Sequence, residues 1–401
     1  MRPFKSLISL DEALSLSSSS VSPVKRTELL PIVEAYGRVS AEDVVSKLSV
    51  PPFSRAAMDG YAVRARDTFG SSKMKPHGLI QQEVIQAGSV PRKALAKGRC
   101  AEIATGAMIP KGADAVVMVE DTEKDGTRIL VHEAVYPGQN VSKKGEDITP
   151  GTKVVSGGDR LNPSKIGALA AIDRAKIRVY AKPLVGIVPT GNEIVELGSD
   201  LEPGKIFNIN SYTLASAVDA NGGRARMVGI VKDSVDDLER AVKANSDCDI
   251  LVFSGGSSVG ERDVMVDMVE RAGKVVFHGI AVKPGKPTLF GTIGKQLVFG
   301  MPGYPTSCLS NAYILLLPVL RRMARLPAKE PASAEARMAS RVVSTTGRTQ
   351  FLTVRLVNGL AHQAFKESGA ITSMAFADGY IVIPAAVDLI EKDEKVTVYL
   401  L

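Results

Sequence analysis

Residues 248–260 read CDILVFSGGSSVG, an unbroken apolar run that ends in a glycine-rich turn. A helical pattern follows from about Arg262 to Ala272, so the stretch predicts a buried strand, a tight loop and a helix. Strands that are apolar on both faces are typical of parallel sheets covered by helices on either side. The stretch therefore predicts a doubly wound α/β domain at the centre of the chain.

The same alternation of strands and helices extends on both sides of this stretch. PLVGIVPTG predicts a strand, a helix is expected over 212–220, and ARMVGIVKD predicts the next strand. Ser234 then opens SVDDLERAVKA as a capping-box helix. Further strands are expected around VVFHGI, TLFGTI and QLVFGM, before a helix over about 306–323.

The rest of the chain has a different texture. Residues 1–47 are interpreted as helices joined by a serine-rich turn, with the apolar pattern resuming at Leu29. Short β-like runs separated by Gly and Pro follow, and Asn162 is expected to cap a helix that begins at Pro163. After Pro327 the chain returns to short strands such as FLTVRLV and KVTVYLL, which predict a small β-barrel.

Composition excludes several classes of protein. Of the 401 residues, 45% are hydrophobic and 23% charged, which is not the composition of a disordered chain. The longest apolar stretch has about half the length of a membrane span, and we expect a cytoplasmic protein without a secretory signal or membrane association. The scattered cysteines and histidines exclude a zinc site of the usual spacing. The net charge of +7 suits anionic ligands, and the absence of Trp argues against a nucleic-acid surface.

In an open parallel sheet, ligands bind beyond the carboxyl ends of the strands. The SGGSSVG loop is expected there, and its backbone N–H groups suit a phosphate or oxyanion. Tight packing between strand and helix is the alternative, and a Walker A loop is excluded because Glu261 stands where Lys would be needed. From this loop we expect substrate contacts by Ser254, Gly255, Gly256, Ser257 and Ser258.

Two more loops are expected at strand ends. In KPGKP two lysines flank Pro-Gly, and each suits an anionic oxygen as a point charge. A solvated basic turn is the alternative, but the position at a strand end favours binding. The other loop is GMPGYPTS. From the two loops we expect substrate contacts by Lys283, Lys286, Pro302, Pro305 and Ser307.

Three carboxylates also follow predicted strands: Glu193, Asp233 and Asp263. Bare carboxylates would repel an anionic ligand, so we expect a bound Mg²⁺ that bridges them to phosphate oxygens. Helix capping is the alternative, above all for Asp233, which stands directly before Ser234.

Two segments outside this domain carry charge among apolar residues. PPFSRAAMDGYA is expected to bury Met58 and Tyr61 around Asp59, and KKGEDI places two lysines beside Glu146 and Asp147. From the residues alone, a surface turn is the favoured interpretation of both segments.

Together these motifs resemble the MoeA family of molybdopterin molybdenumtransferases, which includes the corresponding domain of gephyrin. PPFSRAAMDGYAV, IATGAMIPKGADAVVMVED, GQNVSKKGED, PTGNEI, SGGSSVGERD, AVKPGKP and GMPGYPTS occur in the family's order and span essentially the whole chain. Two positions depart from common family motifs: Tyr304 replaces Asn of a GLPGNPVS loop, and Ser54-Arg55-Ala56 replaces Asp-Asn-Ser. The departures leave open whether tungstate takes the place of molybdate.

The resemblance implies an elongated, dimeric, multidomain protein of α+β and α/β class with four domains. The first would be helical and serve dimerisation, the second mainly β, the third a doubly wound α/β molybdopterin-binding domain and the fourth a small β-barrel. Their expected ranges are 1–47 with 141–180, then 48–140, 181–327 and 328–401.

The implied reaction takes adenylylated molybdopterin and molybdate and gives molybdenum cofactor and AMP. In the family the active site forms between two copies of the chain, and Mg²⁺ would polarise the phosphoanhydride. The expected catalytic residues are Asp59, Asp147, Glu193, Asp233 and Asp263. Of these, Asp59, Asp147, Glu193 and Asp263 would hold the metal, and Thr105 would contact substrate.

Two other functions stay open, and nucleic-acid binding is a distant third that tight, salt-sensitive duplex binding would support. A molybdopterin adenylyltransferase would use the same α/β domain but would be indifferent to changes at Asp59. A non-catalytic molybdopterin-binding scaffold would bind pterin without turnover, although a buried acidic set is costly unless it is used. The adenylyltransferase of the same pathway is also a candidate partner of this chain.

Overall fold

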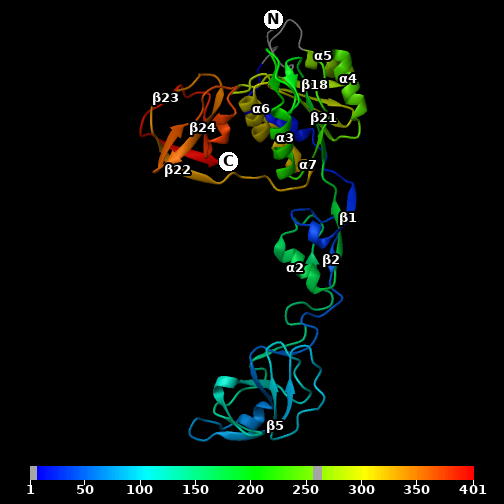
Figure 1. The fold of residues 1–401 in the computed structure, drawn as a ribbon, viewed down its shortest axis with the longest axis vertical. Helices are drawn as coiled ribbons and strands as arrows, with labels where there is room; N and C mark the ends of the chain where they lie inside the picture. Colours follow the sequence, from blue (N-terminus) through cyan, green and yellow to red (C-terminus); the bar gives the residue numbers. More distant parts are fainter. Residues whose placement is uncertain (1–6, 256–263) are drawn as a thin grey trace. The chain divides into compact units, whose positions relative to one another are not determined.

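The computed structural model describes residues 7–255 and 264–401. The predicted site residues Gly256, Ser257, Ser258 and Asp263 lie outside the described residues. The chain divides into two compact units (Figure 1), each with its own hydrophobic cores. The first unit comprises the chain up to Glu28, residues 37–39 and residues 180–401, and the second comprises 29–36 and 40–179.

The first unit is built around a mixed sheet with the strand order β16-β13-β17-β21-β20-β18. The four parallel neighbours are β16 (Arg224–Met227), β13 (Leu184–Pro189), β17 (Ile250–Ser254) and β21 (Gln296–Met301). The other two, β20 (Leu289–Ile293) and β18 (Lys274–His278), are antiparallel, so the prediction of a parallel sheet is wrong at this edge. A turn at Gly294 joins β20 directly to β21, which leaves no length for the crossover that a parallel pair needs.

Helices cover this sheet on both faces, as predicted. Along β17, Ile250 and Val252 belong to one hydrophobic core, whereas Leu251 and Phe253 belong to another. The first core also contains residues of α1 (Leu10–Ser19), α3 (Asn210–Ala220), α6 (Pro305–Asn311), the π-helical η4 (Ala312–Leu316) and α7 (Leu317–Met323). The second core contains residues of α4 (Val235–Ala244) and α5 (Val264–Ala272).

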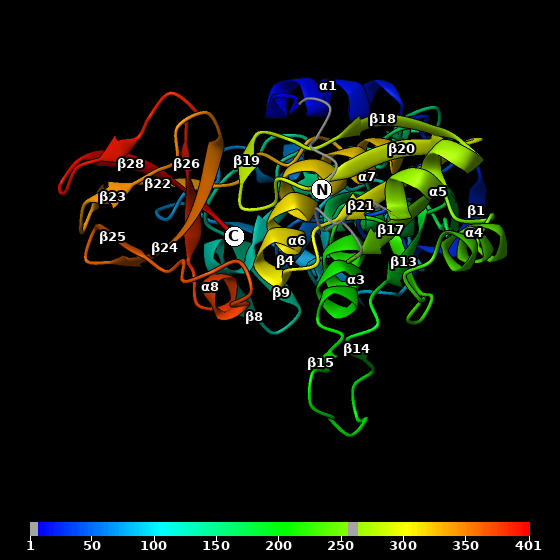
Figure 2. The ribbon, with the colours of Figure 1, turned by 90° about the horizontal axis from the view of Figure 1, so that it is seen from above.

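The C-terminal strands form a closed barrel, as predicted (Figure 2). Its members are β22 (Ser333–Met338), β24 (Thr349–Val357), β25 (Leu360–Gln363), β26 (Gly379–Ile383) and β28 (Lys395–Leu400). Pairing of β24 with β26 closes the barrel. β19 (Val282–Lys283), which comes from the α/β part, pairs in parallel with β24. The α/β part and the barrel are therefore joined by backbone hydrogen bonds within one unit.

The second unit is mainly β, with a sheet in the order β7-β4-β6-β5-β9-β8. Its strands are β4 (Gly60–Val63), β5 (His77–Ile85), β6 (Arg99–Ile103), β7 (Ala115–Met118), β8 (Thr122–Asp125) and β9 (Arg128–Val131). The helix α2 (Pro163–Ala171) begins where it was predicted, since the Asn162 side chain accepts a hydrogen bond from the Lys165 N–H at 2.9 Å.

The prediction for the first residues is wrong in part. The serines expected to form a turn end the helix α1, where the Ser17 hydroxyl donates to the Ala13 carbonyl at 2.7 Å. Leu29 lies in the strand β1 (Thr27–Pro31) and not in a second helix. Pro23 stands between the two elements and stops the helix from continuing. Among the described residues, no helix has both the length and the apolar character that a membrane crossing needs.

Candidate active site at the strand ends

Three parallel strands of the first unit end at one edge of the sheet. Thr190 follows β13, and its N–H donates to the carbonyl of Ser254, the last residue of β17, at 2.9 Å. The Gly255 N–H donates to the carbonyl of Met301, the last residue of β21, at 3.3 Å. The loops that were predicted to carry the chemistry therefore leave the sheet side by side.

Close packing explains the first glycine of SGGSSVG. Gly255 has a φ of +107°, and a Cβ atom there would lie 2.1 Å from the Thr190 carbonyl oxygen. A Cβ on Gly303, in the GMPG turn, would lie 3.5 Å from the Gly255 Cα atom. Only glycine suits position 255, so the packing alternative accounts for this residue. Its contact with substrate stays a prediction.

Four buried polar atoms near this edge have no hydrogen-bond partner among the residues that the structure describes. Asn210, at the start of α3, is fixed because its amide nitrogen donates to the Gly303 carbonyl at 2.9 Å. Buried polar groups are costly when unpaired, so these atoms suit a polar ligand that enters here. They are Thr190 Oγ1, Ser254 Oγ, Asn210 Oδ1 and Ser211 Oγ. Only Ser254 of these four residues could be recognised in the sequence, although the position of Thr190 at a strand end was a signal for it.

A buried asparagine of α6, Asn311, supports the KPGKP loop. The Asn311 amide nitrogen donates to the Gly285 carbonyl at 2.7 Å, and a Cβ on Gly285 would lie 2.4 Å from that amide group. Lys283 Nζ donates to Thr345 Oγ1 at 3.0 Å. Lys283 and Lys286 are both partly buried, which disfavours the alternative of a solvated basic turn.

The GMPGYPTS loop contacts the barrel, which sequence analysis did not predict. The Thr306 N–H donates to the Ser368 carbonyl at 3.0 Å, and the Thr306 hydroxyl donates to the Ala370 carbonyl at 2.9 Å. Tyr304 is 67% exposed, and a Cβ on Gly369 would lie 3.7 Å from its ring. The barrel therefore supplies part of the wall of this site.

The other predicted members of this loop lie at the start of α6. Pro305 begins the helix, and Pro302 and Ser307 are buried. Their substrate contacts stay predictions.

Two of the predicted carboxylates of the first unit, Glu193 and Asp233, lie at the same edge but on the surface. Glu193 is exposed, and its carboxylate lies over Gly191, where a Cβ atom would come within 2.6 Å of it. Asp233 is exposed and does not cap α4, because the cap is Ser234, whose hydroxyl accepts from the Asp237 N–H at 3.2 Å. Within residues 7–255 and 264–401, no group of three His, Cys, Asp or Glu side chains could hold a metal ion. The described part of one chain thus does not bring three of the predicted metal-binding carboxylates together.

The second unit brings two distant motifs together. β3 (Arg55–Ala56) pairs with β10 (Val141–Ser142). The Lys144 N–H donates to Ser54 Oγ at 3.1 Å, and the Asp147 N–H donates to the Val50 carbonyl at 3.0 Å. The segments that carry Asp59 and Asp147 are therefore neighbours. Both residues are exposed in bends, so the interpretation as surface turns agrees with the structure.

Asp59 is an exposed residue on a rigid base. Its Oδ1 accepts from the Thr105 N–H at 2.7 Å, which joins two of the predicted site residues. Gly60 follows, and a Cβ atom there would lie 1.9 Å from the Val117 carbonyl oxygen. Tyr61 is buried as predicted, but Met58 is 47% exposed, so the prediction of its burial is wrong. Met58 precedes the strand β4, and only the strand faces the core.

Three family models match the chain. The model of the MoeA N-terminal region, domains I and II, matches residues 8–172. The model of a probable molybdopterin binding domain matches 186–322, and that of the MoeA C-terminal region, domain IV, matches 335–401.

Relatives and solved structures match over nearly the full length. A Methanocaldococcus jannaschii protein named for molybdopterin biosynthesis is 36% identical over 416 residues, which cover 100% of both chains. The molybdopterin molybdenumtransferase of Bacillus subtilis is 33% identical over 94% of this chain and 90% of its own. A crystal structure of a molybdopterin biosynthesis MoeA protein from Pyrococcus horikoshii has a TM-score of 0.84 at 41% identity, covering 98% of this chain and 99% of that chain.

Proposed function

Because this chain belongs to the MoeA family, we propose that it is a molybdopterin molybdenumtransferase of molybdenum cofactor biosynthesis. It would insert molybdate into adenylylated molybdopterin and release AMP and molybdenum cofactor. The observation that carries this proposal is a set of three buried polar atoms without a hydrogen-bond partner in residues 7–255 and 264–401: Thr190 Oγ1, Ser254 Oγ and Asn210 Oδ1. They lie near the strand ends that carry the KPGKP and GMPGYPTS loops. Polar atoms and lysines together suit a substrate with phosphate and oxyanion groups.

The residues have separate tasks in this proposal. Lys283 and Lys286 would bind the anionic oxygens of the phosphoanhydride and of molybdate. Ser254 and Asn210 would hold the pterin or its phosphate by hydrogen bonds. Asn210 is the first residue of α3 and is fixed by its hydrogen bond to the Gly303 carbonyl. A water oxygen would attack one phosphorus of the anhydride, and the bridging P–O bond would break. AMP and the molybdopterin phosphate then separate, each with an anionic oxygen that the lysines would stabilise, and the protons of the water pass to solvent.

The metal would be captured by the dithiolene sulfurs of the substrate and not by protein thiols. Cys100, Cys248 and Cys308 are free and buried. Burial raises the pKa of Cys308, and of Cys100, to about 12, so neither is a thiolate near neutral pH. Buried thiols without a neighbouring base are structural.

Magnesium dependence belongs to the proposal. Mg²⁺ would neutralise charge on the phosphoanhydride. The carboxylates in question, Asp59, Asp147, Glu193 and Asp263, come from both units, and one chain's described residues do not gather three of them. Metal binding would therefore need a second copy of the chain or the phosphates of the substrate.

We also propose a homodimer whose active site combines the second unit of one copy with the first unit of its partner, as the resemblance to the family implies. Two inactive variants test this arrangement: Asp59→Asn in the second unit and Lys283→Ala in the first. Mixed dimers would hold one intact site and one doubly altered site. An equal mixture, after subunit exchange, should then recover about a quarter of the unmodified activity. If the mixture recovers no activity, both residues belong to a site formed by a single copy, or the dimer interface does not bring them together.

The decisive experiment mixes the purified chain with adenylylated molybdopterin and measures AMP release and pterin-bound metal. Molybdate and tungstate are compared, each with and without Mg²⁺. Oxyanion-dependent AMP release coupled to metal insertion is the expected result and ranks the two oxyanions. ATP-dependent adenylylation without molybdate would identify an adenylyltransferase instead. Tight pterin binding with neither product would leave a scaffold, and the catalytic assignments would fall.

A further inference from the structure

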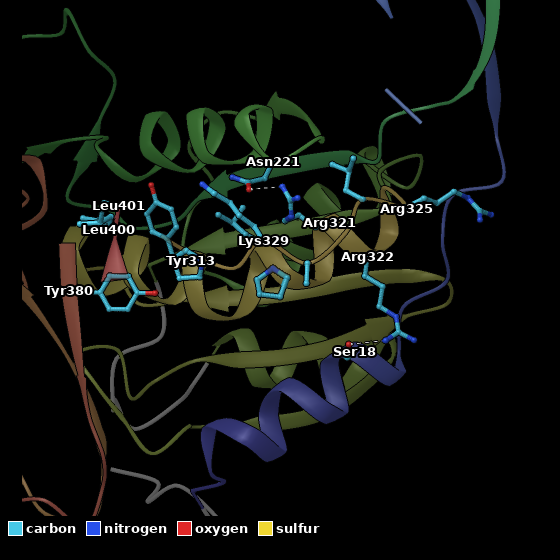
Figure 3. A pocket seen from close by; sticks show the side chains of 15 residues that line it. Ser18, Asn221, Tyr313, Arg321, Arg322, Arg325, Lys329, Tyr380, Leu400 and Leu401 are labelled. Atoms are coloured by element: carbon cyan, nitrogen blue, oxygen red, sulfur yellow. Dashed lines mark hydrogen bonds between the residues drawn. The ribbon is translucent and has the colours of Figure 1, made fainter. Parts of the chain in front are cut away.

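A second pocket lies in the first unit, away from the strand ends. It has a volume of about 540 Å³ and is bounded by α7, the connection that follows it and the barrel strands β26 and β28 (Figure 3). The continuous helical run from Pro305 to Met323 begins at the strand ends and spans about 28 Å at about 1.5 Å per residue. The C-terminal end of that run, where the pocket lies, is thus at the opposite edge of the sheet.

The pocket is lined by four cationic side chains and, in the described part of the chain, by no Asp or Glu. An Arg322 guanidinium nitrogen donates to Ser18 Oγ at 3.2 Å, and Arg325 Nε donates to the Val24 carbonyl at 3.0 Å. Those partners are neutral, so they orient the guanidinium groups without cancelling their charge. The four cations are Arg321, Arg322, Arg325 and Lys329.

Arg321 is oriented by two elements at once. Its guanidinium donates to the Pro327 carbonyl at 2.8 Å and to Asn221 Oδ1, at the end of α3, at 3.4 Å (Figure 3). Lys329 is exposed in the same connection, and no ion pair of its ammonium occurs among the residues with described placement. Fixed guanidinium groups and a mobile ammonium are the combination that binds phosphate.

The other wall of the pocket is aromatic and apolar. Tyr313 and Tyr380 line it, together with Leu317, Pro318 and Leu400. Pro318 lies in the first turn of α7, directly after the π-helical η4. It has no backbone N–H to donate. Burial raises the pKa of Tyr380, so its phenol stays neutral and adds no negative charge.

A smaller cavity of about 20 Å³ adjoins this wall and shares Tyr313 and Tyr380 with the pocket. Thr353 lines the small cavity, and its Oγ1 is buried without a hydrogen-bond partner in the described residues. A cavity of that size has room for one water molecule, which the unpaired Thr353 hydroxyl could bind.

We propose that this pocket binds a small phosphate monoester of an aromatic heterocycle, at a site separate from the strand ends. The volume lies within the usual range for small-molecule sites. Arg321, Arg322 and Lys329 would take the phosphate, and the tyrosine faces would take the ring. Arg325 is directed away from the tyrosines (Figure 3), because its guanidinium lies over the Tyr180 ring at 4.0 Å. Inorganic phosphate alone would leave the apolar wall uncovered, and a neutral ring would leave Arg322 and Lys329 without an anionic partner among the described residues. A purine nucleotide and a phosphorylated pterin share this chemistry.

Titration calorimetry of the full chain tests the proposal. The background is Lys283→Ala, so that the strand-end site contributes little binding. AMP and a pterin monophosphate are titrated in parallel, with adenosine and inorganic phosphate as controls. We expect saturable binding of at least one of the two monoesters, weaker binding of both controls, and an affinity that falls with added salt. The monoester that binds more tightly shows whether the pocket takes a purine nucleotide or a phosphorylated pterin.

Variants locate the binding. Lys329→Glu and Arg322→Glu should each lower the affinity for the monoester by at least about tenfold, because a cation is replaced by a carboxylate. The matched control Lys392→Glu makes the same charge change in the exposed turn before β28 and should leave the affinity unchanged. No saturable binding, an affinity unaffected by both pocket variants, or phosphate binding as tightly as the monoesters would overturn the proposal.

Discussion

The backbone N–H of Thr105 donates to Oδ1 of Asp59 at 2.7 Å, which joins two residues that lie 46 positions apart in the chain. One carboxylate oxygen of Asp59 is thus occupied by the protein itself, and the exposed side chain is oriented. The rigid backbone beneath it, where Gly60 lies against Val117, keeps this orientation. A side chain that is both exposed and oriented suits a role toward a ligand more than a role in stability.

We predict that Asp59→Asn keeps the fold but lowers AMP release by at least about 100-fold. The Asn carbonyl oxygen can still accept from Thr105, so the thermal midpoint should stay close to that of the unmodified chain, while the charge is lost. Rates of AMP release and melting curves measure the two effects. Asp125→Asn, an exposed carboxylate at the end of β8, is the control that should change neither. Full activity of Asp59→Asn would remove this residue from the site.

We predict that Lys283→Ala raises the KM for adenylylated molybdopterin by about tenfold or more, because an anionic oxygen loses a cationic partner. Lys283 also donates to Thr345 Oγ1, so a loss of loop structure must be distinguished from a loss of charge. Thr345→Val removes the hydrogen bond and keeps the lysine. Steady-state kinetics should show a small effect of Thr345→Val beside a large effect of Lys283→Ala. Equal effects of the two variants would assign Lys283 a structural role.

Much of the α/β part could be predicted because its signals are local. β17 is an unbroken apolar run, and α4 begins directly after Ser234 because Ser234 and Asp237 stand at capping positions. The direction of β18 and β20 could not be predicted in this way. Strand polarity depends on which neighbours pair, and the hairpin at Gly294 made β20 antiparallel to β21.

The site could be predicted only where residue type gave a signal. Lysines and glycines in the loops were recognised, whereas Thr190 and Asn210 are of common types. They stand out only because Thr190 Oγ1 and Asn210 Oδ1 are buried without a hydrogen-bond partner among the described residues. The barrel contacts at Thr345 and Ser368 could not be predicted, since they depend on packing between segments about 60 residues apart in the chain.

We predict that a variant with Cys100, Cys248 and Cys308 all replaced by Ala still inserts metal into the substrate. The three thiols are buried, and burial raises the pKa of Cys308 to about 12, so none is a thiolate that could capture molybdenum. The measurement is pterin-bound metal per AMP released, which should match the unmodified chain even if the variant is less stable. A ratio that falls while AMP release persists would give a protein thiol a part in metal capture.

We predict that acid weakens the second unit through Glu42. Burial raises the pKa of this carboxyl. The hydrogen bonds from the Arg178 N–H at 2.9 Å and the Arg174 guanidinium at 3.0 Å together lower the pKa by more, so it lies below the ordinary value of 4.5. A lowered pKa contributes stability that is present above the unfolded value and is lost as pH falls through the folded value. Between about pH 5 and about pH 3, the melting midpoint of the unmodified chain should therefore fall more than that of Glu42→Gln. Parallel curves for the two chains would contradict this.

We predict that Gly285→Ala destabilises the first unit more than a matched glycine substitution does. Gly285 has a φ of +100°, and an added Cβ would lie 2.4 Å from the Asn311 amide, which supports the KPGKP loop. Gly229 has a φ of +93° with nothing within 4 Å of an added Cβ. Gly229→Ala should cost about 1 kcal/mol in backbone strain, and Gly285→Ala about 2–4 kcal/mol because the loop must also move. Urea unfolding gives both values, and the KM should rise only for Gly285→Ala. Equal losses of unfolding free energy in the two variants would mean that the Asn311 side chain moves aside, and that it does not hold the loop.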